Sequence, residues 1–156
     1  MKILLSLLVL QVSLAFAAES FPSGPHPELT PGELCTRPDT YRYPERIAYC
    51  ERDVSSETKD DVFLSYRRLG YTMPSDRRSS YKIDHYIPLC AGGSNGVDNL
   101  WPQHLTIGQQ TDFIEDLGCQ VLAKGKITQA ELIGLIKRAK NDLSEASNVL
   151  RILRNL

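Results

Sequence analysis

Residues 81–104 contain the side chains of this chain that are best suited to chemistry. Asp84 and His85 stand side by side at the end of a β-like run, and a Gly-rich turn follows at residues 92–95. An imidazole of ordinary pKa accepts a proton from water near neutral pH, and a carboxylate binds a hard divalent cation. The pair therefore indicates metal-assisted hydrolysis, although a turn-capping acid beside a surface histidine would show the same two letters.

The local backbone must bring these side chains together. Neighbouring strand residues point to opposite faces of a sheet, so Asp84 and His85 reach one substrate only if a bend or bulge distorts the strand end. Asn99 follows on the next run, and its amide is suited to hold the backbone of the His85 loop from the opposite strand. We therefore expect a small hairpin with a catalytic end.

Three segments around this pair, residues 82–89, 92–95 and 99–103, resemble the HNH endonucleases of the ββα-metal finger type. They are most similar to secreted bacterial members with an Asn-Leu-Trp-Pro-Gln segment, which often carry Thr-Asp-x-x-Glu in the next helix, here at residues 111–115. The resemblance is thinner over about residues 49–125, and it covers neither the Pro-rich N-terminal part nor the C-terminal helix.

The resemblance implies roles for the matching residues. His85 takes the place of the general base that deprotonates the attacking water, which is typically worth about 10²- to 10⁴-fold in rate. Asp84 takes the place of the metal-ligand acid, and Asn99 that of the residue that orients the base. The expected cofactor is a divalent metal, Mg²⁺ first, with Mn²⁺ or another transition metal as alternatives.

The chain departs from the family pattern at the last metal ligand. The family carries a His or Asn on the following helix, where this chain has Ile107 and Gly108. We take His104 as the substitute ligand, and an ordinary histidine at the start of a helix is the alternative. Because Mg²⁺ keeps several waters, one or two protein ligands are compatible with activity.

Overall charge excludes a globally basic nucleic-acid binder. Removing residues 1–17 takes away Lys2 from 18 basic residues, which leaves 17 against 19 acidic residues and a net charge of −2. Phosphate contacts must then come from a local patch, and we expect Arg77, Arg78 and Lys82 to supply it. The alternative for these side chains is a solvated face.

Residues 1–17 have one Lys, a short apolar run and an Ala-Phe-Ala end, which is typical of a cleaved signal peptide; an uncleaved membrane anchor is the alternative. The mature protein is expected to be a secreted or periplasmic monomer that is not in the membrane. An even number of cysteines in an oxidising compartment favours disulfides. We expect them to pair as Cys35–Cys50 and Cys90–Cys119, and a four-cysteine zinc site is the alternative.

The chain length suits one domain. Residues 18–44 are rich in Pro and are expected to form an irregular arm, and residues 45–156 to form the nuclease domain with its C-terminal helices. Hydrophobic periodicity and capping residues predict helices over about 56–69, about 107–124 and from Thr128 onwards, with a last amphipathic segment that is either separate or continuous past Asn141. The fold class is thus α+β, mainly helical, around a ββα-metal hairpin-helix motif.

These features together predict a secreted, metal-dependent endonuclease that hydrolyses phosphodiester bonds of DNA, or also of RNA, with little sequence specificity. The alternative is an HNH-derived exported protein that binds nucleic acid or cell-envelope material without cutting it. The unfilled ligand position on the following helix favours this alternative.

Overall fold

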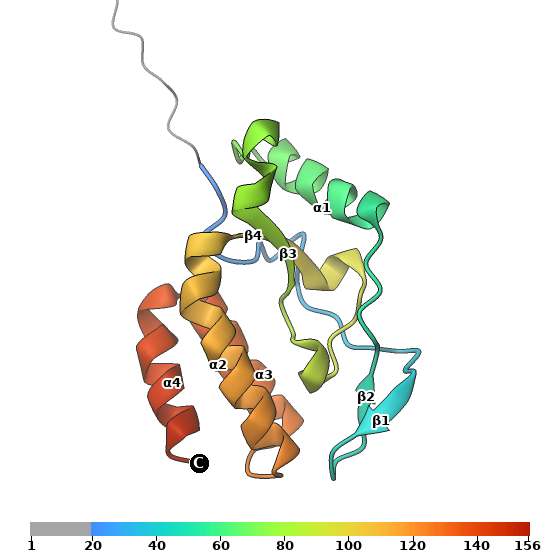
Figure 1. The fold of residues 1–156 in the computed structure, drawn as a ribbon, viewed down its shortest axis with the longest axis vertical. Helices are drawn as coiled ribbons and strands as arrows, with labels where there is room; N and C mark the ends of the chain where they lie inside the picture. Colours follow the sequence, from blue (N-terminus) through green and yellow to red (C-terminus); the bar gives the residue numbers. More distant parts are fainter. Residues whose placement is uncertain (1–19) are drawn as a thin grey trace, which may run out of the picture.

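The computed structural model describes residues 20–156, so the predicted signal peptide, residues 1–17, lies outside the described part. Residues 20–156 form four α-helices and two small antiparallel sheets, which confirms the α+β class (Figure 1). Strand β1 (Thr40–Arg42) pairs with β2 (Ile47–Tyr49), and β3 (Tyr81–His85) pairs with β4 (Leu100–His104). None of the helices within 20–156 has the length and apolar character needed to span a bilayer.

Local sequence signals set the helix boundaries. In α1 (Ser56–Arg68) the hydroxyl of Ser55 accepts a hydrogen bond from the Thr58 amide at 3.0 Å, a typical N-cap. Helix α2 (Leu105–Ala123) follows β4 directly. Helix α3 (Gln129–Asn141) starts with the expected capping box, in which the Thr128 and Glu131 side chains bond each other's amides. These three helices lie within two residues of their predicted limits.

The last amphipathic segment is a separate helix, α4 (Ala146–Arg154). Asp142 ends α3 because its backbone is extended, with φ −140° and ψ 102°. Its carboxylate then accepts from the Ser144 amide at 2.9 Å and starts a short 3₁₀ turn, Leu143–Glu145. The chain therefore turns before α4, and the continuous helix that the sequence left open does not form.

Two hydrophobic clusters flank the β3–β4 hairpin. Helix α1 packs on one side of it, and α2, α3 and α4 lie together on the other (Figure 1). The first cluster joins α1 to the hairpin and contains Val62, Phe63, Tyr66, Met73, Tyr81, Ile83, Leu100, Trp101 and Ile107. The second lies among the three C-terminal helices and includes Ile114, Leu122, Leu132, Ile136, Val149 and Leu153. The hairpin is thus held between two packed layers.

The N-terminal segment differs from the irregular arm expected over residues 18–44, because β1 lies inside it. The turn between β1 and β2 places Tyr43 and Arg46 at φ 61° and 56°, conformations that side chains seldom adopt and that the sequence does not announce. The preceding part runs along the Gly-rich loop: the amide of Gly32 donates to the Asp98 carbonyl and that of Cys35 to the Gly92 carbonyl, both at 2.8 Å.

Disulfides form between Cys35 and Cys50 and between Cys90 and Cys119, as predicted. No free cysteine is left among residues 20–156, so the alternative zinc site has no thiolate ligands there. Two disulfides are typical of proteins in oxidising compartments outside the cytosol.

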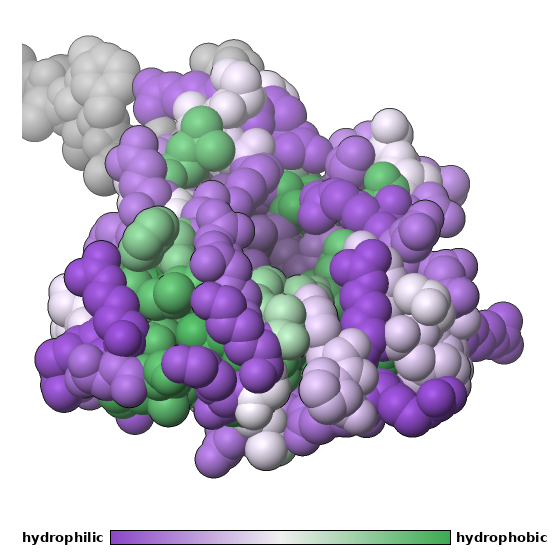
Figure 2. All heavy atoms as spheres, turned by 60° about the horizontal axis from the view of Figure 1, so that its bottom comes forward, coloured by the Kyte–Doolittle hydropathy of each residue, from purple (hydrophilic) through white to green (hydrophobic). Residues whose placement is uncertain are grey.

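Apolar side chains gather on the end of the molecule that carries the C-terminal helices (Figure 2). A groove of about 420 Å³ opens there, and its apolar lining includes Ile127, Leu135, Ile152 and Leu156. This groove is remote in sequence from the predicted catalytic hairpin.

Candidate active site on the two sides of β3

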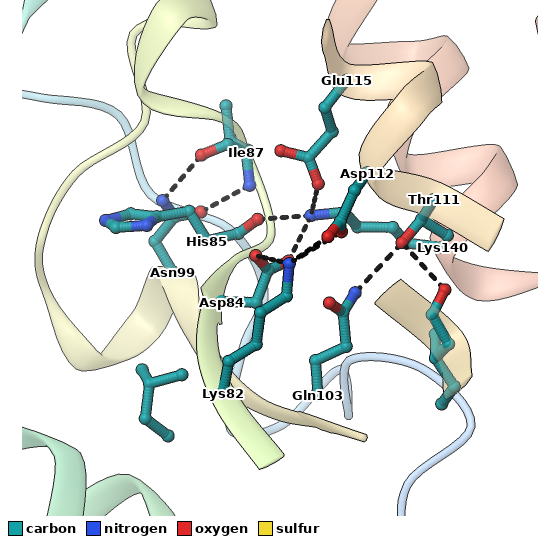
Figure 3. Close-up of polar contacts among 12 residues, drawn as sticks. Lys82, Asp84, His85, Ile87, Asn99, Gln103, Thr111, Asp112, Glu115 and Lys140 are labelled. Carbon is teal, nitrogen blue, oxygen red and sulfur yellow. Dashed lines mark hydrogen bonds and ion pairs between the residues drawn. The ribbon is translucent and has the colours of Figure 1, made fainter. Parts of the chain in front are cut away.

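Strand β3 is regular, so it separates the two residues that the sequence placed side by side. The pairing runs without a bulge from Tyr81 opposite His104 to His85 opposite Leu100. Alternate residues of a strand point to opposite faces. Asp84 accordingly meets side chains from α2 and α3, whereas the His85 ring points away from them (Figure 3). The bulge expected at this strand end is not found.

On the first side, Asp84 binds a buried lysine. The Lys140 ammonium is 2.7 Å from Asp84 Oδ2 and 2.6 Å from Glu115 Oε1, and it donates to the His85 carbonyl oxygen at 2.5 Å. Lys140 is only 1% exposed. An internal cation thus links α3 to α2 and to the backbone of β3. We call Asp84, Glu115 and Lys140 the internal ion cluster.

The pKa values in this cluster show which groups carry charge. Burial opposes ionisation of Asp84, but the charges of Lys140 and Lys82 outweigh it and hold its pKa below the ordinary value. Burial also opposes the charge on Lys140, yet the two carboxylates raise its pKa. Burial raises the pKa of Glu115 and the Lys140 charge only partly offsets this, so that the resulting pKa is about 7. Near pH 7 the cluster therefore holds the Lys140 ammonium, the Asp84 carboxylate and a Glu115 side chain that is partly protonated.

Lys82 extends the same side of the strand towards α2. Its ammonium lies 2.7 Å from Asp112 and 3.5 Å from Asp84. Gln103, opposite Lys82 on β4, is fully buried and donates to the Thr111 hydroxyl at 3.1 Å. These contacts fasten the start of α2 to the hairpin.

On the second side, the His85 ring is hydrogen-bonded through both of its nitrogens. Arg52 Nη1 lies 3.0 Å from His85 Nδ1, and Nη2 donates to the Ile83 carbonyl at 2.9 Å. His85 Nε2 lies 3.0 Å from Asn95 Oδ1, while Asn95 Nδ2 donates to the Glu51 carbonyl at 2.6 Å. Because a guanidinium only donates, Nδ1 accepts; because Asn95 presents its oxygen, Nε2 carries the hydrogen.

The environment of His85 keeps this ring neutral. Burial lowers its pKa, the Arg52 charge lowers it further, and the hydrogen bond to Asn95 raises it, with a resulting pKa of about 4. His85 as a whole residue is 4% exposed. At neutral pH, His85 therefore presents one lone pair, at Nδ1, to the Arg52 guanidinium.

Asn99 forms the clamp that the sequence predicted. Its Oδ1 accepts from the Ile87 amide at 2.8 Å, and its Nδ2 donates to the carbonyls of Ile87 and Ser94 at 3.0 and 2.9 Å. The residue is fully buried. Gly93 fits closely against this clamp, because a Cβ there would overlap the Ile87 carbonyl oxygen. Asn99 thus fixes the loop after His85 through the backbone, whereas its catalytic role stays a prediction.

His104 lies apart from Asp84 and caps a helix. Its Nδ1 accepts from the Thr106 amide at 3.3 Å at the start of α2, and its ring stacks on Phe21 with centroids 4.1 Å apart. It pairs with Tyr81, three residues from Asp84 along β3, which places the two side chains on opposite faces. The structure does not bring the two predicted metal ligands together.

The residues present do not fit a resident divalent cation at Asp84. Among residues 20–156, no three His, Cys, Asp or Glu side chains converge as a ligand set. Both Asp84 oxygens face ammonium groups, from Lys140 and Lys82. The carboxylates of Asp84, Asp112 and Glu115 are thus already largely balanced by two positive charges, and a dication would meet strong repulsion there.

The predicted phosphate-binding residues do not flank His85. Lys82 points to the opposite face of β3, and Arg78 lies over the Phe63 ring, 3.5 Å from its centroid, with Asp60 at 3.9 Å. Arg77 is exposed on the 3₁₀ segment Ser75–Ser80. Their binding of substrate stays a prediction, and intramolecular contacts already engage Arg78 and Lys82.

Three residues of the site escaped sequence reasoning as site residues. Glu115 belongs to the Thr-Asp-x-x-Glu segment but received no role. Lys140 follows Leu132 and Ile136 at a spacing of four, which places a charge on the buried face of α3 and was a readable signal. Arg52 left no such signal, because its partners lie 31 and 33 residues further along the chain.

Comparisons with known proteins do not extend these observations. No protein-family model matches the chain, and neither a curated protein nor a solved structure gives a match. The HNH resemblance therefore stays a prediction, and the geometry around His85 is the basis for assigning function.

Proposed function

We propose that the protein is an exported endonuclease that hydrolyses phosphodiester bonds of DNA, with His85 as general base. The observation that carries this proposal is a buried, neutral imidazole whose Nδ1 lone pair faces a single exposed guanidinium. The Asn99 clamp and the sequence resemblance over residues 82–103 support it. The two disulfides support export.

The reaction follows from the hydrogen-bond order around the ring. A water oxygen forms a bond to phosphorus while His85 Nδ1 takes the water proton. The bond from phosphorus to the 3′-oxygen breaks, and that oxygen leaves with the electron pair and takes a proton from solvent. Nε2 keeps its hydrogen on Asn95 Oδ1, which stabilises the imidazolium that forms.

This scheme assigns no step to a metal, because the Asp84 carboxylate is already paired with Lys140. Dependence on Mg²⁺ or Mn²⁺ is a separate expectation that comes from the family resemblance, and comparing activity in these ions with activity in EDTA tests it. It cannot be argued from the internal ion cluster.

A second candidate function is nucleic-acid binding without hydrolysis. The pairing of Asp84 with Lys140 favours it, since the predicted metal-ligand acid serves here as the counter-ion of an internal lysine. Under this candidate the His85 side provides a surface for a phosphate, and no bond is broken.

Plasmid nicking separates the two candidates. The oxidised protein is incubated with supercoiled DNA in Mg²⁺, in Mn²⁺ and in EDTA. His85→Gln is expected to reduce nicking by about 10²- to 10⁴-fold. His26→Gln is the matched control, because His26 lies in the N-terminal segment and contacts Glu28.

Each outcome decides between the candidates. Nicking by His85→Gln at the wild-type rate removes His85 as the general base. DNA retardation without nicking in any of the three buffers supports the binding protein. Nicking that survives EDTA contradicts the expected metal dependence and leaves the general-base proposal in place.

A further inference from the structure

Arg52 covers His85 although it is itself exposed. His85 as a whole residue is 4% exposed, and the Arg52 guanidinium lies 3.0 Å from Nδ1. Arg52 belongs to the loop before α1, far in sequence from the hairpin. A water or substrate atom can approach Nδ1 only if this guanidinium moves.

The charge of Arg52 has no anionic partner among the residues that the structure describes. Its two acceptors, the His85 ring and the Ile83 carbonyl, are both neutral. Within residues 20–156 no carboxylate pairs with it, in contrast to Lys140 and Lys82. Hydrogen bonds from a guanidinium to an anion are roughly twice as strong as neutral ones, and the planar fork matches two phosphate oxygens. Arg52 is thus a cation available to a phosphate.

The backbone that leads into Arg52 is anchored. The preceding Cys50 is tied to Cys35, and the Glu51 amide donates to Asp39 at 2.8 Å. The Glu51 carbonyl accepts from Asn95, the residue that also binds His85 Nε2. The side chain can therefore swing while its base stays beside the histidine.

We propose that Arg52 is the phosphate-binding residue of this site and that a bound phosphodiester draws its guanidinium away from His85 Nδ1. This inference rests on the proposed function and adds the substrate anchor to it. The anion gains a bidentate partner, and Nδ1 loses a donor. The lone pair is then uncovered only when a phosphate is in place.

Nitrogen-15 NMR of the imidazole tests this exchange. The spectrum distinguishes Nδ1 from Nε2 and responds to the loss of a hydrogen bond at Nδ1. The probe is hexathymidylate with phosphorothioate linkages, which keep the negative charge and resist hydrolysis. The matched ligand has methylphosphonate linkages, which remove that charge. The charged probe is expected to shift the His85 Nδ1 signal, and the neutral one to leave it unchanged.

Variants assign the shift to Arg52. Arg52→Gln is expected to bind the charged probe about 10- to 100-fold more weakly, as for the loss of a charged hydrogen bond. Its free-state Nδ1 signal should already resemble that of the liganded wild type. Arg52→Lys keeps the charge without the fork and should fall between them. Arg68→Gln, exposed at the other end of α1, is the charge-matched control and should behave as wild type.

The result that overturns the proposal is a charged probe that binds and leaves His85 Nδ1 unchanged, or that binds Arg52→Gln as tightly as wild type. Circular dichroism confirms that each variant is folded before it is titrated. If plasmid nicking is absent but the Arg52-dependent shift is present, phosphate binding stands and hydrolysis falls. If nicking is present and Arg52→Gln nicks as wild type, hydrolysis stands and the role of Arg52 falls.

Discussion

The two sides of β3 hold their polar residues in opposite ways. On the Asp84 side, the buried Lys140 supplies the cation, and its acidic partners come from the chain itself. On the His85 side, the histidine is buried but its cationic neighbour, Arg52, is exposed and has no acidic partner in the described part of the chain. The first arrangement is complete and stabilises the fold, whereas the second has an unbalanced charge at its opening. Adjacent residues of one strand thus face a closed ion cluster on one side and the proposed phosphate site on the other.

The largest effect is expected on the Asp84 side, from Lys140→Met at pH 7. The change leaves Asp84 and Glu115 buried without their shared cation, so the free energy of unfolding should fall by about 3 to 5 kcal/mol. Urea denaturation measures it. Lys124→Met, at the exposed C-terminal end of α2, is the control and should change it by less than about 0.5 kcal/mol.

Mn²⁺ gives the Lys140→Met protein a second measurement. If Mn²⁺ raises the unfolding temperature of the variant but not that of the wild type, the Lys140 ammonium occupies a position that a metal ion can take when the lysine is removed. A loss of stability below about 1 kcal/mol in Lys140→Met would show that the cluster is not the structural element described above.

Asn99→Ala should affect both sides, because Asn99 holds the loop that follows them. The substitution leaves the Ile87 amide and the carbonyls of Ile87 and Ser94 without their partner, and a cost of about 3 kcal/mol is expected. Hydrogen exchange should show faster opening of the Ile87 amide. An unchanged exchange rate at this amide would contradict the clamp.

The pH dependence of stability should have opposite signs on the two sides. The pKa of His85 falls from 6.5 to about 4 on folding, so its contribution is complete above pH 6.5 and is lost as the pH falls towards 4. The pKa of Glu115 rises from 4.5 to about 7, so its contribution is complete below pH 4.5 and is lost as the pH rises towards 7. Each amounts to about 3 kcal/mol, and in the wild type they largely cancel.

Single substitutions separate the two contributions. Between pH 4.5 and 6.5, Glu115→Gln should become more stable as the pH rises, and His85→Gln less stable. Urea midpoints across this range measure both slopes. Slopes of the same sign in the two variants would break the comparison between the sides.

Arg52→Gln should have the smallest effect on stability, below about 1 kcal/mol, because the side chain is exposed. Its charge lowers the pKa of His85, so that pKa should rise in the variant. NMR titration of the imidazole measures the change. A pKa of His85 that stays constant would show that the two groups are not in contact in solution.

Local signals predicted much of the fold. Ser55 and Thr128 indicated two helix starts, and the position of Asn99 indicated the clamp. The disulfide pairs were predicted because each joins an irregular segment to a helix and the two do not cross. These features were predictable because a helix cap involves residues close together in the sequence, and because cysteine has few structural roles in an exported protein. The β1–β2 hairpin was missed because its turn uses Tyr43 and Arg46 rather than Gly or Asn.

The candidate site was less predictable because its partners are distant in sequence. Asp84 meets Lys140 across 56 residues, and His85 meets Arg52 across 33. The family resemblance predicted a metal site at the adjacent residues Asp84 and His85. Because the register of β3 is regular, these two side chains point to opposite faces of the strand. No local pattern encodes which charge fills the space beside a carboxylate.

The contacts of the N-terminal segment govern the order in which the domain assembles. The Cys35–Cys50 link needs only the first third of the chain, whereas the Pro31 carbonyl binds Lys137 across 106 residues. Thr30 similarly waits for the Leu100 carbonyl, 70 residues later. Closing such long loops slows folding. The segment that is synthesised early can therefore complete its contacts only after β4 and α3 have been made, and a chain truncated before α3 would lack the Lys137 contact.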